Sequence, residues 1–269
     1  MSIWQSILSF LDFRMETPQP YGWFHLLFLA LSFLALIPLL KAKDRSPRAI
    51  RRFVLITSIV VILFEVYKQI NFSFAAENDF AFDYQWYAFP FQFCSTPMYI
   101  GLLAGLTKKG RLHESLCAYL ATFSLFAGLS VMVYPVYVFI AQIGINIQTM
   151  VCHGSMITIG IYLLATGYVP LKHKTILKAL PVFAVTLGMA TIMNDIAYYS
   201  GLLETETFNM FYVSPYCDPH LPVYSWVQEV VPYPFCLIIY IAGFTLAGYL
   251  MLLISMGVAK LFKKQPAAI

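Results

Sequence analysis

Cys94 and His153 are the two residues of this chain whose types and setting best suit covalent chemistry. Cys94 lies between Pro90 and Pro97 at the start of one apolar stretch, and His153 lies near the start of another. A thiolate is the reactive form of cysteine, and a helix N-terminus or a nearby histidine favours it. A cysteine and a histidine at matching depth are the minimum set for a thiol nucleophile with a general base.

Each of these residues also has a purely structural interpretation. A cysteine in an apolar helix commonly packs as a small hydrophobic residue, and a buried histidine can simply bond a helix carbonyl. Pro97 removes a backbone donor and leaves the carbonyl of Phe93 unbonded, which predicts a kinked helix with polar backbone beside the thiol. Such a kink suits an oxyanion pocket, but membrane prolines also serve packing alone. From the residues alone both interpretations stay open.

Further polar residues fall at the same depth and are expected to bind or orient a substrate. They are His25, Glu65, Lys68, Gln92, Asn194 and Asn209. Ionisable groups within apolar segments are costly and usually face a bundle interior or a wet cavity, so we expect this ring to surround the cysteine and histidine. Asn194 or Gln92 would orient the imidazole or hold an oxyanion. Glu65 and Lys68 are three residues apart and can pair on one helix face, so a structural ion pair is the alternative.

Other constellations are weaker. Cys217 and His220 supply only two ligands, which do not make a metal site, so we expect no metal and no cofactor. Cys94, Cys152, Cys217 and Cys236 lie towards the side expected to be oxidising, which leaves a disulfide open. Cys117 falls near the inner end of an apolar segment, where we expect it to pack. No glycine-rich phosphate loop or Gly-x-Ser-x-Gly segment occurs.

Composition indicates the elements that must position these residues. Of the 269 residues, 60% are hydrophobic and only 11% are charged, against about 25% in a soluble domain. A helix needs about 20 apolar residues to cross a bilayer. Seven segments qualify: 22–40, 50–71, 88–107, 115–135, 149–169, 174–200 and 231–260. We therefore predict an all-α polytopic membrane bundle of seven transmembrane helices forming a single domain, 1–269.

Two further segments complete this domain. Residues 1–18 lack a basic region and a small-residue cleavage site, so no removable signal peptide is indicated. Ile3, Trp4, Ile7, Leu8 and Leu11 share one helical face, which predicts a short interfacial helix. The connection 201–230 is long for a simple linker and rich in Pro, Tyr and acidic residues, which predicts an outer loop or lid.

The positions of the charges predict the orientation. Fifteen of the 17 basic residues fall on one side of the seven-helix arrangement, within 41–52, 108–111, 172–178 and 260–264, and eleven of the 13 acidic residues fall on the other. Basic loops face the cytoplasm, which puts the N-terminus outside and the C-terminus in the cytoplasm. We expect a multi-pass protein of the plasma membrane with its site towards the outer leaflet. The net charge of +4 therefore gives no reason to expect nucleic acid as a partner.

Four segments, in order along the chain, carry a resemblance to a known family. "PYGWFHLLFLAL" contains His25, "FPFQFCSTPMYI" contains Cys94, "VCHGSMITIGIYLL" contains His153, and "NDIAYYSGLLETETFNMFYVSP" contains Asn194 and Asn209. Together they resemble the YwaF-like bacterial integral membrane proteins and the related transmembrane-protein-164 acyltransferases. Gln92 stands where that family has a histidine, and Met210 and Phe211 replace its Asn-Tyr pair.

This resemblance implies an acyltransferase that moves a fatty acyl chain onto a lysophospholipid or a related lipid. Cys94 would carry the acyl group as a thioester and His153 would act as the base, with membrane phospholipids and lysophospholipids as partners. One alternative is a lipid or small-molecule transporter that uses Glu65, Lys68 and Asp195, against which the absence of inverted repeats counts. A noncatalytic membrane scaffold or sensor is the other.

Overall fold

A computed structural model describes residues 2–136, 138–201, 207–218, 221 and 223–263. Their helices are α1 (Ile3–Leu11), α2 (Trp23–Leu34), α3 (Leu36–Lys41), α4 (Pro47–Ser73), α5 (Thr96–Leu106), α6 (Arg111–Tyr119), α7 (Leu125–Val133), α8 (Ile143–Ala165), α9 (Thr175–Ser200), α10 (Tyr224–Val230) and α11 (Tyr233–Lys263). A π-helical turn, η3 (Leu120–Ser124), joins α6 to α7, and short 3-10 turns lie at Ala76–Asn78, Trp86–Ala88 and Met210–Tyr212. No strand occurs in these ranges, so the all-α prediction is confirmed.

Within this part of the chain, five helical segments are long and apolar enough to cross a membrane. They are Trp23–Lys41, Arg111–Val133, Ile143–Ala165, Thr175–Ser200 and Tyr233–Leu261. The predicted segment 50–71 lies inside α4, a 27-residue helix that carries Glu65 and Lys68 and is not one of the five. The predicted segment 88–107 contains only the 11-residue helix α5.

The start of α5 differs from the prediction for a physical reason. Proline disfavours a helical conformation in the residue before it, and Phe89, before Pro90, is extended. Pro97 sits in the first turn of α5, where its missing N–H costs no helical hydrogen bond. The predicted kink at Pro97 is therefore wrong, because this proline begins a helix instead of interrupting one. Cys94 consequently lies in a turn two residues before α5.

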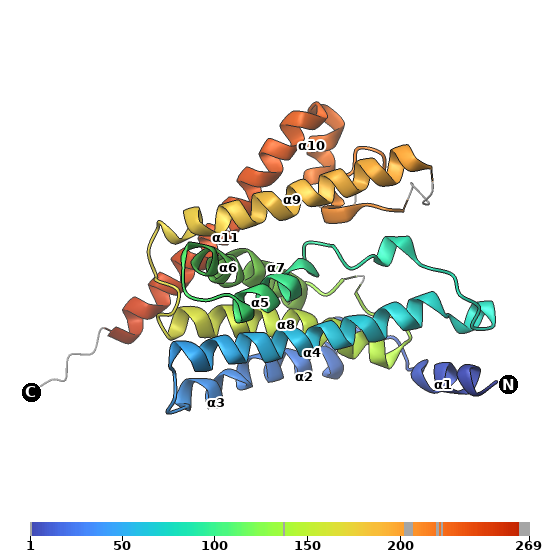
Figure 1. The fold of residues 1–269 in the computed structure, drawn as a ribbon, viewed down its shortest axis with the longest axis horizontal. Coiled ribbons are helices and arrows are strands. Elements are labelled where there is room, and N and C mark those ends of the chain that lie inside the picture. The colour runs from blue at the N-terminus through green and yellow to red at the C-terminus, as the bar shows by residue number, and fades with distance from the viewer. Residues whose placement is uncertain (1, 137, 202–206, 219–220, 222, 264–269) are drawn as a thin grey trace, which may run out of the picture.

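α8 is the central helix of the bundle, packed by α2, α4, α7 and η3 (Figure 1). On its far side α6 packs against α9, and α5 packs against α4. Small residues let these backbones approach, as is common between membrane helices. A Cβ atom on Gly128 of α7 would lie 2.7 Å from the carbonyl oxygen of His153 in α8. The α7–α8 contact therefore depends on a glycine directly opposite His153.

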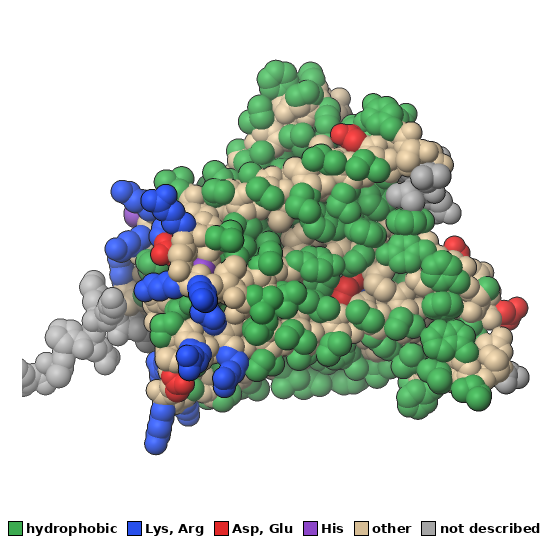
Figure 2. All heavy atoms as spheres, viewed as in Figure 1, with side chains coloured by type: hydrophobic (Ala, Val, Ile, Leu, Met, Phe, Trp, Pro, Cys, Tyr) green, Lys and Arg blue, Asp and Glu red, His purple; other side chains and the backbone are tan. Residues whose placement is uncertain are grey.

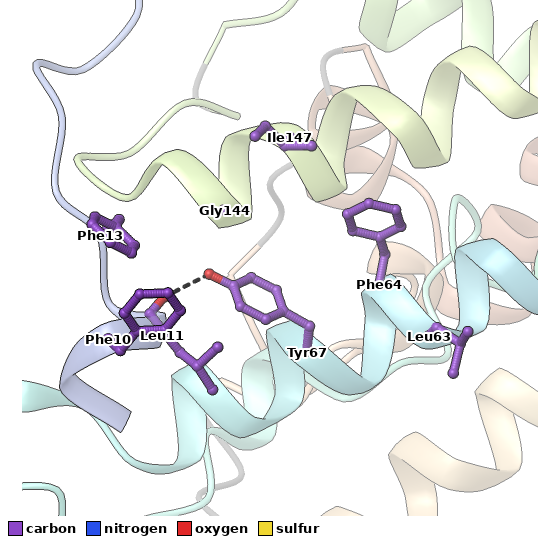
Figure 3. Close-up of a pocket in the computed structure, with 8 residues that line it drawn as sticks. All are labelled: Phe10, Leu11, Phe13, Leu63, Phe64, Tyr67, Gly144 and Ile147. Atoms are coloured by element: carbon purple, nitrogen blue, oxygen red, sulfur yellow. Dashed lines mark hydrogen bonds between the residues drawn. The ribbon is translucent and has the colours of Figure 1, made fainter. Parts of the chain in front are cut away.

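The predicted N-terminal helix is present as α1. Ser2 caps it through a capping box with Gln5, and Leu8 is buried whereas Ile3 is exposed. Figure 3 shows Phe10 and Phe13, which follow along this segment, beside the α4 side chain of Tyr67, whose hydroxyl donates to the carbonyl of Leu11 at 2.7 Å. These residues line an apolar groove of about 390 Å³ against α4 and α8, with no cysteine or histidine in its lining.

Charge divides the molecule into two ends. Figure 2 shows most Lys and Arg side chains gathered at one end of the helices and most of the visible acidic side chains away from it. α1 lies at the end opposite the basic one, whereas the C-terminal end of α11 lies at the basic end (Figure 1). The flanks between the two ends are apolar, with large hydrophobic side chains exposed along α2, α4, α9 and α11. This distribution is what a membrane protein requires.

Candidate functional site

Cys94 is positioned by a turn that the start of α5 forces. The backbone N–H groups of Ser95 and Thr96 both donate to the carbonyl of Gln92, at 2.9 and 3.0 Å. The Thr96 hydroxyl donates to the carbonyl of Phe93 at 3.2 Å and lies 3.1 Å from the buried hydroxyl of Tyr119 in α6. These bonds fix a partly buried Cys94 at the junction between irregular chain and helix. Irregular backbone at this depth needs protein around it to satisfy its polar groups.

Cys94 lines a small internal cavity of about 10 Å³, enough for one water-sized group. Its other lining residues come from α4, α5, η3, and α8: Ser58, Val61, Pro97, Met98, Leu120, Ser124, Cys152, Ser155, Met156 and Ile159. The hydroxyls of Ser58 and Ser124 are buried and have no hydrogen-bond partner among the described residues. Buried polar groups normally find partners, so these two hydroxyls are available to a polar group beside the thiol.

Sequence reasoning missed both serines. Ser124 belongs to the π-helical turn η3, all of whose residues are buried. A π-turn inserts one extra residue into a helix and is frequent at functional sites, but it has no clear sequence signature. The only signal in the sequence was a hydroxyl side chain inside a predicted span, and membrane helices contain many of those.

His153 occupies a fully enclosed position on α8. Its Nδ1 lies 2.7 Å from the carbonyl oxygen of Thr149. Because a carbonyl only accepts, Nδ1 carries the proton, and Nε2 of the neutral ring holds a lone pair. Nε2 is buried and has no partner in the described chain, so no hydrogen bond joins it to Cys94. The neutral ring of His153 therefore has the tautomer of a general base, but no group that could give Nε2 a proton lies within hydrogen-bond distance among the described residues.

Cys152, the residue before His153, contacts the turn that holds Cys94. The thiol of Cys152 lies 3.8 Å from the carbonyl oxygen of Cys94, and Cys152 directly precedes His153 on α8. His153 itself is not among the described residues that line the cavity, although Cys152, Ser155 and Met156 from the same two turns are. The turn of α8 that holds the histidine thus packs against the turn that holds the nucleophile candidate.

Glu65 and Lys68 form the ion pair that their spacing allows. Lys68 Nζ lies 2.7 Å from Glu65 Oε1, and Glu65 is buried. Gln69 donates to the same oxygen at 2.8 Å, and Gln148 of α8 donates to Oε2 at 2.9 Å. This network ties α4 to α8, and it continues to the carbonyl of Ala88 through Gln69. The structural ion pair is present, and together with Gln69 and Gln148 it occupies both oxygens of the carboxylate.

Glu65 and Gln69 of this network also line a groove between α4 and the chain before α5. The groove has a volume of about 320 Å³ and is lined by Ile62, Glu65, Val66, Gln69, Ile70, Ser73, Phe74, Phe82, Tyr84, Pro90, Met98 and Tyr99. Met98 also lines the cavity at Cys94, so its side chain stands between the two spaces. Ligand pockets commonly have this size, apolar walls and few polar groups.

The side chain of His25 forms hydrogen bonds to backbone groups, and so do the amide side chains of Gln92, Asn194 and Asn209. His25 accepts from the backbone N–H of Tyr21 at 3.0 Å, and its Nε2 lies 2.9 Å from the carbonyl of Met132, so both ring nitrogens are occupied. The Asn194 amide donates to the carbonyl of Met210 and accepts from its N–H, at 3.0 and 2.7 Å. His25 therefore ties α2 to the end of α7, away from the thiol.

The side chains of Gln92 and Asn209 form hydrogen bonds to the backbone of residues 209–214, the segment that Asn194 also bonds. Gln92 donates to the carbonyl of Asn209 and accepts from the N–H of Phe211, both at 2.9 Å, and Asn209 accepts from the N–H of Ser214. The expectation that Asn194 or Gln92 orients the imidazole is not what the geometry shows, because both of their amide atoms already bond backbone. The amide nitrogen of Asn209 is buried without a partner among the described residues.

No group of three or more His, Cys, Asp or Glu side chains suited to a metal occurs in the described chain. His220 lies outside the described residues.

Comparison with known proteins gives one match. The model of the TMEM164 family matches residues 16–254, which is most of the chain and contains every candidate site residue named above. No curated protein and no solved structure matches.

Proposed function

The chain belongs to the TMEM164 family, and from this premise we propose that it is a membrane-embedded acyltransferase. It moves a fatty acyl chain onto a lysophospholipid or a related lipid through a thioester on Cys94. The observation that carries the proposal is the contact between the turn of α8 that holds His153 and the turn that holds Cys94, together with a buried His153 Nε2 that has no hydrogen-bond partner among the described residues. Buried polar atoms normally have a partner, so an unpartnered imidazole nitrogen is a candidate for a functional role.

The transfer takes two balanced steps. In the first, His153 Nε2 takes the proton of the Cys94 thiol, and the thiolate attacks the carbonyl carbon of an acyl ester in the donor lipid. The ester C–O bond breaks, the leaving alkoxide takes the proton from the imidazolium, and a thioester remains on Cys94. In the second, the hydroxyl of the lysophospholipid gives its proton to Nε2 and attacks the thioester carbonyl, the C–S bond breaks, and the leaving thiolate takes the proton back from the imidazolium. No soluble cofactor takes part.

The proposal requires the thiol and Nε2 to come into contact during the reaction. Catalytic hydrogen bonds are often long or absent before substrate binds. The serine hydroxyls of Ser58 and Ser124 are buried without partners beside Cys94. They are the groups best placed to donate to the oxyanion that forms on the acyl carbonyl, a contact that typically contributes several kcal/mol to catalysis, about 2.7–4 per donor.

The groove between α4 and the chain before α5 is the proposed acyl site. Its walls are mostly apolar, Glu65 and Gln69 are among its polar lining residues, and it meets the cysteine cavity at Met98. Lys68, which pairs with Glu65, is the cation nearest in the chain to this lining. A buried reaction site also excludes the water that would hydrolyse the thioester.

We further propose seven spans, with α4 and the α5 segment added to the five apolar helices. The N-terminus then lies outside, the C-terminus lies in the cytoplasm, and the site faces the outer leaflet of the plasma membrane. The gathering of Lys and Arg at one end supports this orientation. The placement of α1 and the end of α11 at opposite ends of the molecule supports an odd number of spans.

Residues 201–230 are proposed as a lid over this outer mouth. In the described part, the bonds from Gln92, Asn194 and Asn209 hold the 3-10 turn Met210–Tyr212, and the Tyr240 hydroxyl donates to the carbonyl of Phe211 at 3.0 Å. Phe211 is completely buried although its φ of 58° is costly for a residue with a side chain. Strain of this kind persists where surrounding contacts hold it in place.

Intact-mass measurement on the purified full-length protein in phospholipid nanodiscs tests the function. We expect a fraction of the protein to gain the mass of one fatty acyl group, and a labelled lysophospholipid to remove it. Cys94→Ala abolishes the adduct and the transfer, whereas Cys152→Ala, which changes a thiol in the same cavity, retains both. An adduct that persists in Cys94→Ala, or transfer that survives this change, rejects Cys94 as the acyl carrier. Absence of both the adduct and the transfer in the natural protein rejects the acyltransferase and leaves the scaffold or transporter alternatives.

A further inference from the structure

A second polar cavity lies at the basic end of the molecule, remote in the fold from the Cys94 turn. It has a volume of about 310 Å³ and is bounded by the N-terminal ends of α4, α6 and α9 and by the α8–α9 connection. Its lining residues are Pro47, Lys109, His113, Glu114, Cys117, Ala118, Gly167, Tyr168, Val169, Pro170, Thr175 and Lys178. Three charged side chains line it, Lys109, Glu114 and Lys178, which is unusual for a space that serves only packing.

Cations dominate the electrostatics of this cavity. Lys109 and Lys178 both line it, and Lys178 Nζ lies within 2.6 Å of Glu114, which offsets one of the two positive charges. Arg51 of α4 acts electrostatically on His113 and Cys117, which line the cavity. The Nε of this arginine is buried and has no hydrogen-bond partner in the described chain. The result is an excess of positive charge with an unused donor beside it.

A neutral hydrogen-bond network forms the inner wall. His113 Nε2 lies 2.6 Å from the hydroxyl of Tyr168 and 3.5 Å from the thiol of Cys117, and Nδ1 lies 3.3 Å from the hydroxyl of Thr107. Cys117 packs in the hydrophobic core, as expected, and the contact with His113 gives its thiol a polar partner as well. With both ring nitrogens engaged, His113 fixes this wall and leaves the cations to face the open space.

We propose that this cavity binds the phosphate group of an anionic ligand, held between Lys109 and Lys178 with Arg51 behind them. A phosphate monoester carries nearly two negative charges and three acceptor oxygens, which match two ammonium groups and a guanidinium better than a single carboxylate does. Basic pockets between membrane helices on the cytoplasmic side commonly take lipid head groups. Glu114 is the internal anion that the ligand displaces from Lys178. This inference does not depend on the acyltransferase proposal, because it uses none of the same residues.

Phosphate can reach the cavity from a lipid or from solution, and two probes separate these sources. Dioctanoyl phosphatidic acid presents the phosphate on a diacyl lipid, and glycerol 3-phosphate presents it alone. Binding to the purified full-length protein is measured by the rise in its thermal unfolding temperature, since a ligand that binds only the folded state stabilises it. Stabilisation by both probes assigns a soluble phosphate ester, and stabilisation by the lipid alone assigns the inner leaflet.

Three variants test which residues bind the phosphate group. Lys109→Gln weakens probe binding about tenfold, because it removes a charged hydrogen bond to the phosphate. Glu114→Gln tightens binding about threefold, because it frees Lys178 from an exposed ion pair. Lys260→Gln, an exposed residue of α11 that does not line the cavity, leaves binding unchanged.

Two results overturn the proposal. One is that neither probe shifts the unfolding temperature of the natural protein at millimolar concentration. The other is that Lys109→Gln and Lys260→Gln bind the probes equally. The unfolding temperature of each variant without probe shows whether it folds, and Lys109 is exposed in a loop, where its change should leave that temperature unaltered.

Discussion

The thiol of Cys152 lies 3.8 Å from the carbonyl oxygen of Cys94, so the central helix α8 contacts the turn before α5 at the residue next to His153. This contact joins segments that are 58 residues apart in the chain. Cys94 and Cys152 line the same small cavity, so the proposed chemistry depends on which of the two thiols reacts. The cavity that both cysteines line is too small for an acyl chain, and the larger groove reaches it at Met98.

Replacing His153 separates a catalytic histidine from a structural one. His153→Gln should lower the transfer rate at least a hundredfold, because it removes the base. Its unfolding temperature should change little, because Nε2 makes no bond and only Nδ1 has a partner, in its own helix. The rate is measured with a labelled lysophospholipid in nanodiscs.

His25→Gln is the matched comparison. Both nitrogens of His25 hold backbone groups of other segments, so this change should lower the unfolding temperature and leave the rate per folded molecule near that of the natural protein. If the two variants exchange these phenotypes, His153 is the structural histidine.

Gly128→Ala tests the close approach of α7 to α8. A Cβ atom at this position would meet the carbonyl oxygen of His153 at 2.7 Å and the Cβ of Met156 at 2.8 Å, and backbone cannot move aside cheaply. Overpacking of this kind costs about 1–3 kcal/mol, seen as a lower unfolding temperature. Gly188→Ala in α9 meets no atom within 4 Å and serves as the control. Equal stability of the two variants would show that α7 and α8 do not pack this closely.

Asn194→Ala tests how the outer segment is held. The change leaves the N–H and carbonyl of Met210 without partners in a buried position, at about 1–3 kcal/mol for each unsatisfied group. We expect faster hydrogen exchange at residues 208–214 and earlier proteolytic cleavage there. Thr191→Ala, on the same helix, loses only a bond to its own helix carbonyl and should leave both measurements unchanged. Unchanged exchange in Asn194→Ala would mean that other contacts hold the segment.

The ion pair between Arg14 and Glu77 lies outside the membrane-spanning segments, and it predicts that acid weakens the contact between these two residues. Glu77 bonds its own backbone N–H and the guanidinium of Arg14, which together hold the pKa of its carboxyl below the ordinary value. A carboxyl whose pKa is lower in the folded state stabilises that state above its unfolded pKa, near 4.3, and the benefit disappears as the pH falls through the folded value. The loop after α4 should therefore loosen from Arg14 in acid, at a pH below the unfolded pKa of the carboxyl.

Arg14→Gln removes this response. Hydrogen exchange at residues 75–83 should rise with acid in the natural protein and should already be raised at pH 7 in the variant. A pH profile that is identical in both proteins would show that the pair has no role in holding the loop.

The sequence alone determined the class of this protein. A chain with 60% hydrophobic and 11% charged residues must hide its apolar surface in lipid, and runs of about 20 apolar residues can do so only as helices. The ends of α2–α3, α8 and α9 agree with the predicted segments to within about six residues, because hydrophobic length is a local property. The i,i+3 spacing of Glu65 and Lys68 likewise predicted their ion pair.

Tertiary structure decided what each polar residue does. Depth along a helix says at which level a side chain lies, but only packing says what it faces. Gln92 and Asn194 had the right depth to touch the imidazole, yet both bond the backbone of a segment that returns from beyond α9. Ser124 became available beside Cys94 only through a π-turn and the contact of α8 with α5, which depend on residues distant in the chain. Local pattern carries no information about such long-range contacts, so the sequence predicted the ring of polar residues and the fold assigned their partners.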